Sequence, residues 1–112
     1  MEQWAIERTM PGRIKVRGEI DLASSRDLRR CLEGELDDPP RGVEVDLSGV
    51  DFIDSNGLHT LLHAHQYAGA RGSQLVVVAP SAAVRRVLEL SGCDNILTIA
   101  SSPEARPASA AD

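Results

Sequence analysis

The segment Val50-Asp51-Phe52-Ile53-Asp54-Ser55-Asn56-Gly57-Leu58 joins an apolar strand to a helix through a short polar turn. The hydroxyl of Ser55 falls at the predicted start of that helix. The first turn of a helix carries unpaired backbone N–H groups and about half a positive charge, so a phosphate attached there is stabilised without a change of fold. This position predicts that Ser55 is a switch residue.

Downstream of this junction the chain continues to alternate helices and strands. We expect a helix from the junction to about Arg71, ended by Gly72, because its apolar positions recur at three- and four-residue spacing. Those positions are Leu58, Leu61, Leu62, His65 and Ala68. The apolar run at residues 75–79 is typical of a strand covered on both faces. Pro80-Ser81 then begins another helix that Gly92 ends, and residues 95–99 predict a short strand or extended edge.

Upstream of the junction, residues 4–9 and 13–18 flank the turn Met10-Pro11-Gly12 and predict a β-hairpin. A helix follows, which we expect Ser24 or Ser25 to cap and Asp38-Pro39-Pro40 to end. Its buried stripe is predicted to be Leu28, Cys31, Leu32 and Leu36.

Residues 43–47 alternate with period two and predict a strand, which a turn region at Ser48-Gly49 separates from Phe52-Ile53. From Val43 onward the order strand, helix, strand, helix implies right-handed parallel crossovers. The predicted fold class is therefore α/β, with a mixed four- to five-stranded sheet and helices packed mainly on one face.

The composition predicts one globular domain. The chain has 112 residues, of which 42% are hydrophobic and 26% are charged, in the usual range for such a domain. Residues 1–100 contain all the predicted elements. Residues 101–112 are rich in Ser, Pro, Ala and charge, which predicts a disordered tail.

The charge and the apolar runs exclude several function classes. A net charge of −5 without a basic face argues against nucleic-acid binding. No run approaches the roughly 18 apolar residues of a membrane span, so we expect a cytoplasmic protein with no membrane partner. Cys31 and Cys93 lie far apart in apolar surroundings and are expected to be reduced core thiols.

Three motifs in register give a family resemblance. They are Gly18-Glu19-Ile20-Asp21-Leu22, Asp46-Leu47-Ser48-Gly49-Val50 and Phe52-Ile53-Asp54-Ser55-Asn56-Gly57-Leu58. In this order and spacing, from about residue 4 to about residue 100, the chain resembles the STAS domains of anti-sigma factor antagonists. The resemblance implies a single STAS domain over residues 1–100.

The resemblance also implies a function. Unphosphorylated members of that family bind an anti-sigma factor that is also a serine kinase, and so release the sigma factor. The family's phosphorylated serine directly follows the aspartate of the turn, which corresponds to Ser55. A serine phosphatase is the expected second partner. The implied binding surface consists of Asp21, Asp54, Ser55, Asn56, Gly57, Leu58 and His59.

Two positions depart from the family pattern. Asn56 stands where a second Ser or Thr is usual, which leaves Ser55 as the one acceptor in the turn. His59 replaces a residue that is commonly small, and this departure bears on which kinase is the partner.

A different interpretation remains open from the sequence. Asp54 or Ser55 could be an ordinary helix N-cap, which is worth about 1 kcal/mol. In that case the protein would be a constitutive scaffold subunit of a signalling or transport complex. Intact-mass measurement with a candidate kinase, beside Ser55→Ala, separates the two functions.

Catalytic and metal-binding signals are weak. His59 and His63 share a helix face, yet no third zinc ligand accompanies them with suitable spacing. The chain has no glycine-rich phosphate loop, and no oxyanion site or orienting group accompanies a Ser55–His59 pair. We therefore expect neither enzymatic activity, nor a cofactor, nor a metal site.

Overall fold

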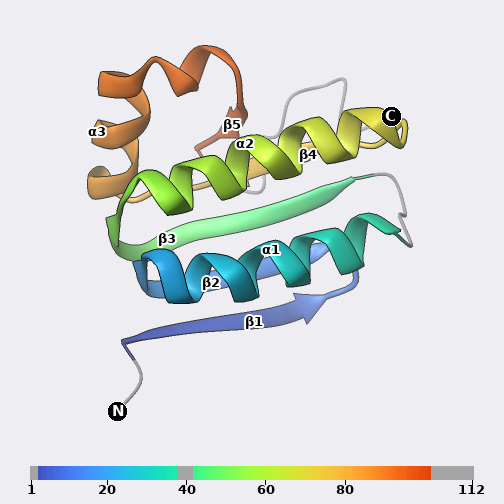
Figure 1. The fold of residues 1–112 in the computed structure, drawn as a ribbon, viewed down its shortest axis with the longest axis horizontal. Helices are drawn as coiled ribbons and strands as arrows, with labels where there is room; N and C mark the ends of the chain where they lie inside the picture. The colour runs from blue at the N-terminus through green and yellow to red at the C-terminus, as the bar shows by residue number, and fades with distance from the viewer. Residues whose placement is uncertain (1–2, 38–41, 102–112) are drawn as a thin grey trace.

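The computed structural model describes residues 3–37 and 42–101, which form one five-stranded sheet with helices against it (Figure 1). The strands and helices in chain order are β1 Trp4–Met10, β2 Arg13–Ile20, α1 Leu22–Asp37, β3 Val43–Ile53, α2 Ser55–Ala70, β4 Leu75–Val78, α3 Ala82–Ser91, the 3₁₀ turn η1 Cys93–Asn95 and β5 Thr98–Ala100. The predicted hairpin and the predicted alternation of helices and strands are both present.

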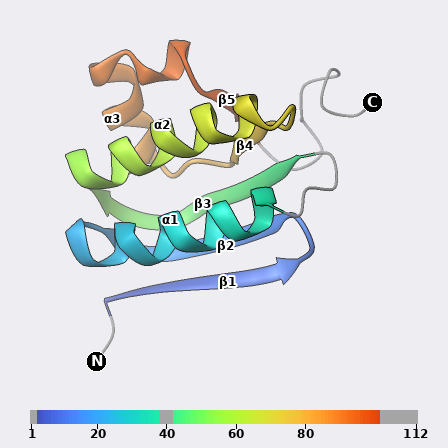
Figure 2. The same cartoon turned by 45° about the vertical axis from the view of Figure 1, so that its right-hand side comes forward.

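The strands lie in the order β1-β2-β3-β4-β5. β1 is antiparallel to β2, and every later pair is parallel, so the sheet is mixed as predicted. α1 and α2 lie side by side across one face of the sheet (Figures 1 and 2). α3 packs Val84 and Leu88 into the same apolar core, which agrees with helices mainly on one face.

β3 differs from its prediction. Residues 43–53 form one continuous strand, and the turn region expected at Ser48-Gly49 is wrong. Irregularities in the β2–β3 register absorb the extra residues instead, so the strand bends and continues. This continuity carries β3 past the end of its pairing with β4 and delivers Ile53 to the start of α2.

The last strand is also shorter than expected. Residues 93–95 form a 3₁₀ turn, Ile96 is exposed, and β5 begins only at Thr98. Both predicted helix-ending glycines adopt left-handed backbone conformations, with φ of +68° at Gly72 and +79° at Gly92. Glycine has no Cβ to clash there, so these helices end where the sequence indicated.

The core is aliphatic, and one cysteine belongs to it. Cys93 is buried as predicted, but Cys31 is exposed on α1, so its assignment to the core stripe is wrong. Leu28, Leu32 and Leu36 fill that stripe without it. The segment Asp38-Pro39-Pro40 and the residues of the predicted tail beyond Ser101 lie outside the described residues.

Candidate functional site

The ends of β2 and β3 bring two helix starts together. Ile20 pairs with Ile53, and the backbone N–H of Asp54 donates to the carbonyl of Ile20 at 3.1 Å. Because β2 and β3 are parallel, α1 and α2 begin at the same edge of the sheet, at the left in Figure 1. Asp21 and Asp54 therefore lie at neighbouring positions although they are far apart in sequence.

Asp54 is the N-cap of α2. Its carboxylate accepts hydrogen bonds from the backbone N–H groups of Asn56 at 2.9 Å and Gly57 at 3.2 Å. These are orphan donors of the first turn, and the cap satisfies them. The interpretation in which Ser55 itself caps the helix is therefore wrong.

Ser55 is the first residue of α2 and is exposed to solvent. Within the described chain its hydroxyl makes no hydrogen bond to another group. The positive end of the helix dipole lies beneath this hydroxyl, while the Asp54 carboxylate already occupies two of the nearby donors. A phosphate on Ser55 would therefore gain from the dipole and would face a neighbouring negative charge.

Gly57 is buried under the turn, where the first turn of α2 approaches the sheet closely. A Cβ atom at this position would lie 2.6 Å from Cγ2 of Ile20 and 2.8 Å from Cγ1 of Ile53. Such distances are far inside van der Waals contact, so only glycine lets the helix start this close to both strand ends. Gly57 positions the site and is not itself accessible.

The other predicted residues of the turn differ in accessibility. His59 is exposed, Asn56 is half-buried, and Leu58 is partly buried against the core. The carbonyl of Asn56 accepts a hydrogen bond from the Thr60 hydroxyl at 3.0 Å. A partner docking on this end can therefore contact Ser55 and His59 fully and Leu58 only in part.

Asp21 caps α1 in a closed arrangement. Its carboxylate accepts from the backbone N–H of Ser24 at 3.1 Å, and the hydroxyl of Ser24 accepts from the backbone N–H of Asp21 at 2.8 Å. The hydrogen bond from the Ser24 backbone is the main cause that lowers the pKa of Asp21. The prediction that Ser24 or Ser25 caps this helix is wrong, because the helix begins at Leu22 and Ser24 is its third residue.

Sequence reasoning missed two apolar side chains near the same edge. Leu22 is 54% exposed at the start of α1, and Phe52 is 48% exposed near the end of β3. Strand alternation was the available signal for Phe52, because Ile53 points into the core and its neighbour must point away. Exposed apolar groups beside the candidate acceptor suit a protein partner.

One histidine of α2, His63, forms a hydrogen bond with a carboxylate of α1. Nε2 of His63 lies 2.7 Å from a carboxylate oxygen of Glu33 on α1, and this hydrogen bond is the main cause that lowers the pKa of Glu33. No cluster of three or more potential metal ligands occurs among residues 3–37 and 42–101. His65, predicted on the buried stripe, is only half-buried, and Thr60 and Ala64 occupy that face instead.

Within the part of the chain that the structure describes, no helix has both the length and the apolar character needed to cross a membrane.

Comparison with known proteins identifies the family. A family model described as "Mlab, STAS domain" matches residues 7–98. The chain is 30% identical over 86 residues to a STAS-domain containing protein of Pseudomonas aeruginosa, covering 77% of this chain and 84% of that protein. It is 30% identical over 89 residues to the anti-sigma-F factor antagonist RsfB of Mycobacterium tuberculosis, covering 80% of this chain and 72% of RsfB.

A solved structure agrees with the sequence matches. The crystal structure of an anti-sigma factor antagonist from Mycobacterium paratuberculosis superposes with a TM-score of 0.80 at 27% identity, covering 97% of this chain and 93% of that one. The sequence matches and the superposition both extend over most of the chain and include the junction at Ser55. This chain belongs to the STAS domain family.

Proposed function

We propose that this protein is an anti-sigma factor antagonist that works as a phosphorylation-controlled switch. Unphosphorylated, it binds an anti-sigma factor serine kinase and so frees a sigma factor for transcription; phosphorylated at Ser55, it lets the kinase go. The observation that carries the proposal is the exposed Ser55 hydroxyl, which makes no hydrogen bond to the described chain at a helix start that Asp54 already caps. The antagonist names of RsfB and of the Mycobacterium paratuberculosis protein support it.

Phosphoryl transfer to Ser55 requires few catalytic groups from this protein. Oγ of Ser55 attacks the terminal phosphorus of ATP, its proton passes to a base of the kinase, and ADP leaves with the electron pair of the broken P–O bond. The kinase supplies the nucleotide site, the magnesium ion and the base, so the substrate need only present a rigid, reachable hydroxyl. A helix start anchored by the Asp54 cap presents Ser55 in this way.

Release follows from electrostatics. Phosphorylation adds about −1.5 to −2 charges at pH 7, beside the carboxylate of Asp54 and at the edge that also carries Asp21. In the free protein, water and a helix-dipole interaction of about 0.3–1 kcal/mol accommodate this charge. In a packed interface the charge would be desolvated, and an unpaired buried charge costs several kcal/mol, which is orders of magnitude in affinity.

The remaining roles follow from the same surface. A serine phosphatase would reset the switch by hydrolysing the phosphate from Ser55. The protein itself would act by binding alone, without catalysis or a cofactor, in the cytoplasm and without direct contact to nucleic acid or membrane. The proposed docking surface comprises Asp21, Asp54, Ser55, Asn56, Leu58 and His59, with Gly57 beneath it as the residue that lets α2 begin there.

Intact-mass spectrometry tests the acceptor. The purified protein is incubated with ATP and a candidate anti-sigma factor serine kinase, and we expect the mass of one phosphate to be added. Ser55→Ala should abolish the increase, whereas Ser48→Ala, which removes another exposed serine on β3, should retain it. Phosphate that persists in Ser55→Ala would place the acceptor elsewhere.

Binding of the same kinase tests the switch. We expect the phosphorylated protein to bind at least about 100-fold more weakly than the unphosphorylated form. Circular dichroism and the free energy of unfolding should change little between the two forms. Equal affinity of the two forms would contradict the switch.

A constitutive scaffold is the alternative function. It requires a stable assembly whose affinity does not depend on Ser55. Unmodified mass with every co-encoded kinase, together with a complex that survives Ser55→Glu, would favour the scaffold. This alternative allowed either Asp54 or Ser55 as the cap, and the cap is Asp54.

A further inference from the structure

β1 forms an open edge of the sheet. It pairs with β2 on one side, and no strand among the described residues pairs with its other side, at the bottom of Figure 1. An unpaired edge presents backbone N–H and C=O groups that another strand can bind. The question is which strand fits beside it.

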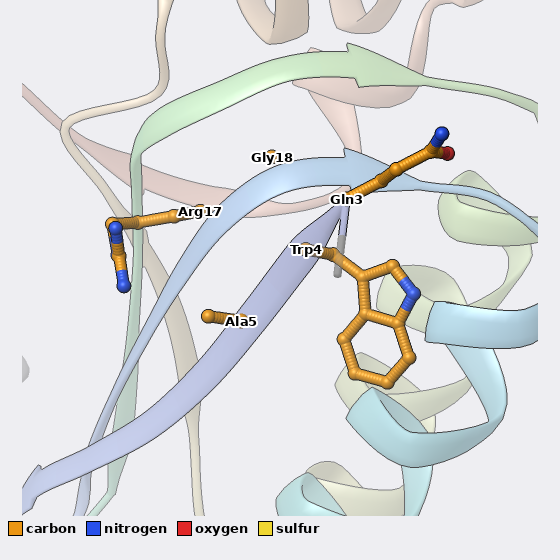
Figure 3. Close-up of a pocket in the computed structure, with 5 residues that line it drawn as sticks. All are labelled: Gln3, Trp4, Ala5, Arg17 and Gly18. Carbon is orange, nitrogen blue, oxygen red and sulfur yellow. The ribbon is translucent and has the colours of Figure 1, made fainter. Parts of the chain in front are cut away.

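Two surface pockets border this edge strand. A groove of about 420 Å³ between β1 and α1 is lined by Trp4, Ala5, Ile6, Asp27, Arg30 and Cys31. A second hollow, lined by Gln3, Trp4, Ala5, Arg17 and Gly18, lies at the start of the strand (Figure 3). Alternate side chains of an added strand would enter hollows on opposite faces, which is how strand addition obtains specificity.

The side chains that border these hollows differ in chemistry. Figure 3 shows Trp4 directed towards α1, whereas Arg17 extends on the other side, away from β1 and towards β3. On the α1 side β1 contributes the apolar Trp4 and Ile6, and α1 contributes the charged Asp27 and Arg30. On the other face Arg17 stands opposite Ala5 in the β1–β2 register, and its guanidinium has no ion-pair partner in the described chain.

These surroundings define the complementary strand. It must alternate apolar residues on the α1 side with an acidic residue on the other, placed opposite Ala5. The Arg17 side chain lies against Gly49 of β3, so its guanidinium reaches that acidic residue only by turning back over the small Ala5 side chain. β1 itself has this pattern. Ile6 and Glu7 are consecutive, so they point to opposite faces, and the exposed Glu7 carboxylate likewise has no ion-pair partner in the described residues.

We propose that β1 pairs antiparallel with β1 of a second copy of this chain, with Ile6 opposite Ile6 across the two-fold axis. In that register Ala5 faces Glu7 of the second copy, so each Arg17 meets the other copy's Glu7 and two ion pairs form symmetrically. On the α1 side Trp4 faces Arg8 of the second copy, whose guanidinium is held by an ion pair with Glu35 of its own α1 at 2.6 Å. The result is a continuous ten-stranded sheet with isologous contacts.

Neighbouring registers fit less well. A two-fold axis at Glu7 would set the two Glu7 carboxylates directly opposite each other, which is destabilising. An axis at Ala5 would separate Glu7 from Arg17 and shorten the paired segment. A junction of two short strands buries little area, so the dimer should be weak and concentration-dependent.

Charge reversal tests the pairing. Sedimentation velocity of the full chain, from about 1 μM to about 1 mM, should show a monomer–dimer equilibrium. Glu7→Arg or Arg17→Glu alone should raise the dissociation constant at least about tenfold, because each sets two like-charge pairs across the axis. The double variant with both changes should recover most of the loss. Arg86→Glu, the same charge change on an exposed residue of α3, is the control and should leave the dimer unchanged.

Disulfide trapping tests the register. In a Cys31→Ser background, Ala5→Cys, Ile6→Cys and Glu7→Cys each place one thiol on β1, while Cys93 stays buried. Residues directly opposite in an antiparallel pair have Cα atoms about 4.5–5.5 Å apart, within disulfide range. Ile6→Cys should form the covalent dimer fastest on mild oxidation. Fastest trapping of Ala5→Cys or Glu7→Cys would overturn the register.

Three further outcomes would overturn self-pairing. A monomer at all concentrations would do so, as would a dimer indifferent to both charge reversals. Protection of the β1 amides from hydrogen exchange only when another protein is added would assign the edge to that protein instead. Ser55→Glu should leave the dimer unchanged, so failure of this proposal is distinguishable from failure of the phosphorylation switch.

Discussion

The two helix starts at the edge of the sheet are built from the same residue types and behave differently. Each begins with an aspartate cap and has a serine in its first turn: Asp21 with Ser24, and Asp54 with Ser55. Ser24 is 1% exposed, and its hydroxyl forms hydrogen bonds with Asp21 and with the carbonyl of Glu19. Ser55 is exposed, and its hydroxyl makes no hydrogen bond to the described chain.

The difference comes from position within the first turn. At the third helical residue, the side chain of Ser24 folds back onto the cap and closes a reciprocal pair of hydrogen bonds. At the first helical residue, the exposed hydroxyl of Ser55 makes no hydrogen bond to the cap or to any other described residue. A serine one residue after the cap is therefore free to be modified, while a serine three residues after it stabilises the helix.

The largest expected effect on stability comes from Gly57, where the first turn of α2 lies close to Ile20 and Ile53. Gly57→Ala should lower the free energy of unfolding by about 1–3 kcal/mol, because the added methyl clashes with Ile20 and Ile53. Urea denaturation measures this directly. Gly69→Ala in the same helix is the matched control: its Cβ meets no atom within 4 Å, so it should stabilise by about 0.5–1 kcal/mol. Equal effects of the two changes would contradict the close approach.

Alanine substitutions of Ser24 and Ser55 should change the free energy of unfolding by different amounts in the same urea denaturation assay. Ser24→Ala should cost about 1–2 kcal/mol, because the backbone N–H of Asp21 loses its acceptor. Ser55→Ala should stay within about 0.5 kcal/mol of the unaltered protein, because it changes an exposed side chain that does not itself cap the helix. A large loss in Ser55→Ala would mean that its hydroxyl has a structural role after all.

The Asp54 cap allows a finer test of α2. Asp54→Ala should destabilise by about 1 kcal/mol, because two backbone donors lose their acceptor. Asp54→Asn should cost only a few tenths of a kcal/mol, since an asparagine oxygen can accept the same bonds. If Asp54→Asn were as damaging as Asp54→Ala, the charge and not the hydrogen bonds would hold the helix start.

The smallest expected effect is the acid dependence at Asp21. Its pKa lies below the ordinary value of 3.8, mainly because the backbone N–H of Ser24 donates to the carboxylate. A lowered folded-state pKa contributes stability that is complete above 3.8 and is lost as the pH falls from there through the folded value. Asp21→Asn keeps a capping oxygen without titrating, so its stability should fall less steeply in that window. NMR titration of the Asp21 carboxyl gives an independent check.

Much of the fold could be read from local patterns. The hairpin, the apolar strand β4 and the glycine-ended helices follow from turn chemistry and periodicity, which depend on residues near in sequence. The predicted break at Ser48-Gly49 was wrong, because the pairing of β2 with β3 absorbs irregular residues as bulges. The exposure of Cys31 was also missed, since its helix has enough leucines to fill the stripe.

The candidate site, like the fold, has features that follow from local sequence and features that depend on tertiary structure. The residues Asp54-Ser55-Asn56-Gly57 specify by themselves a strand-to-helix turn with one available hydroxyl, since capping and helix initiation are short-range effects. Asp21 entered the predicted surface only through the family resemblance. Tertiary structure alone decided that Gly57 is buried against Ile20 and Ile53 and that the hydroxyl of Ser24 is closed off. These outcomes depend on parallel pairing of β2 with β3, and an interaction between strands separated by a whole helix cannot be read from either strand's own sequence.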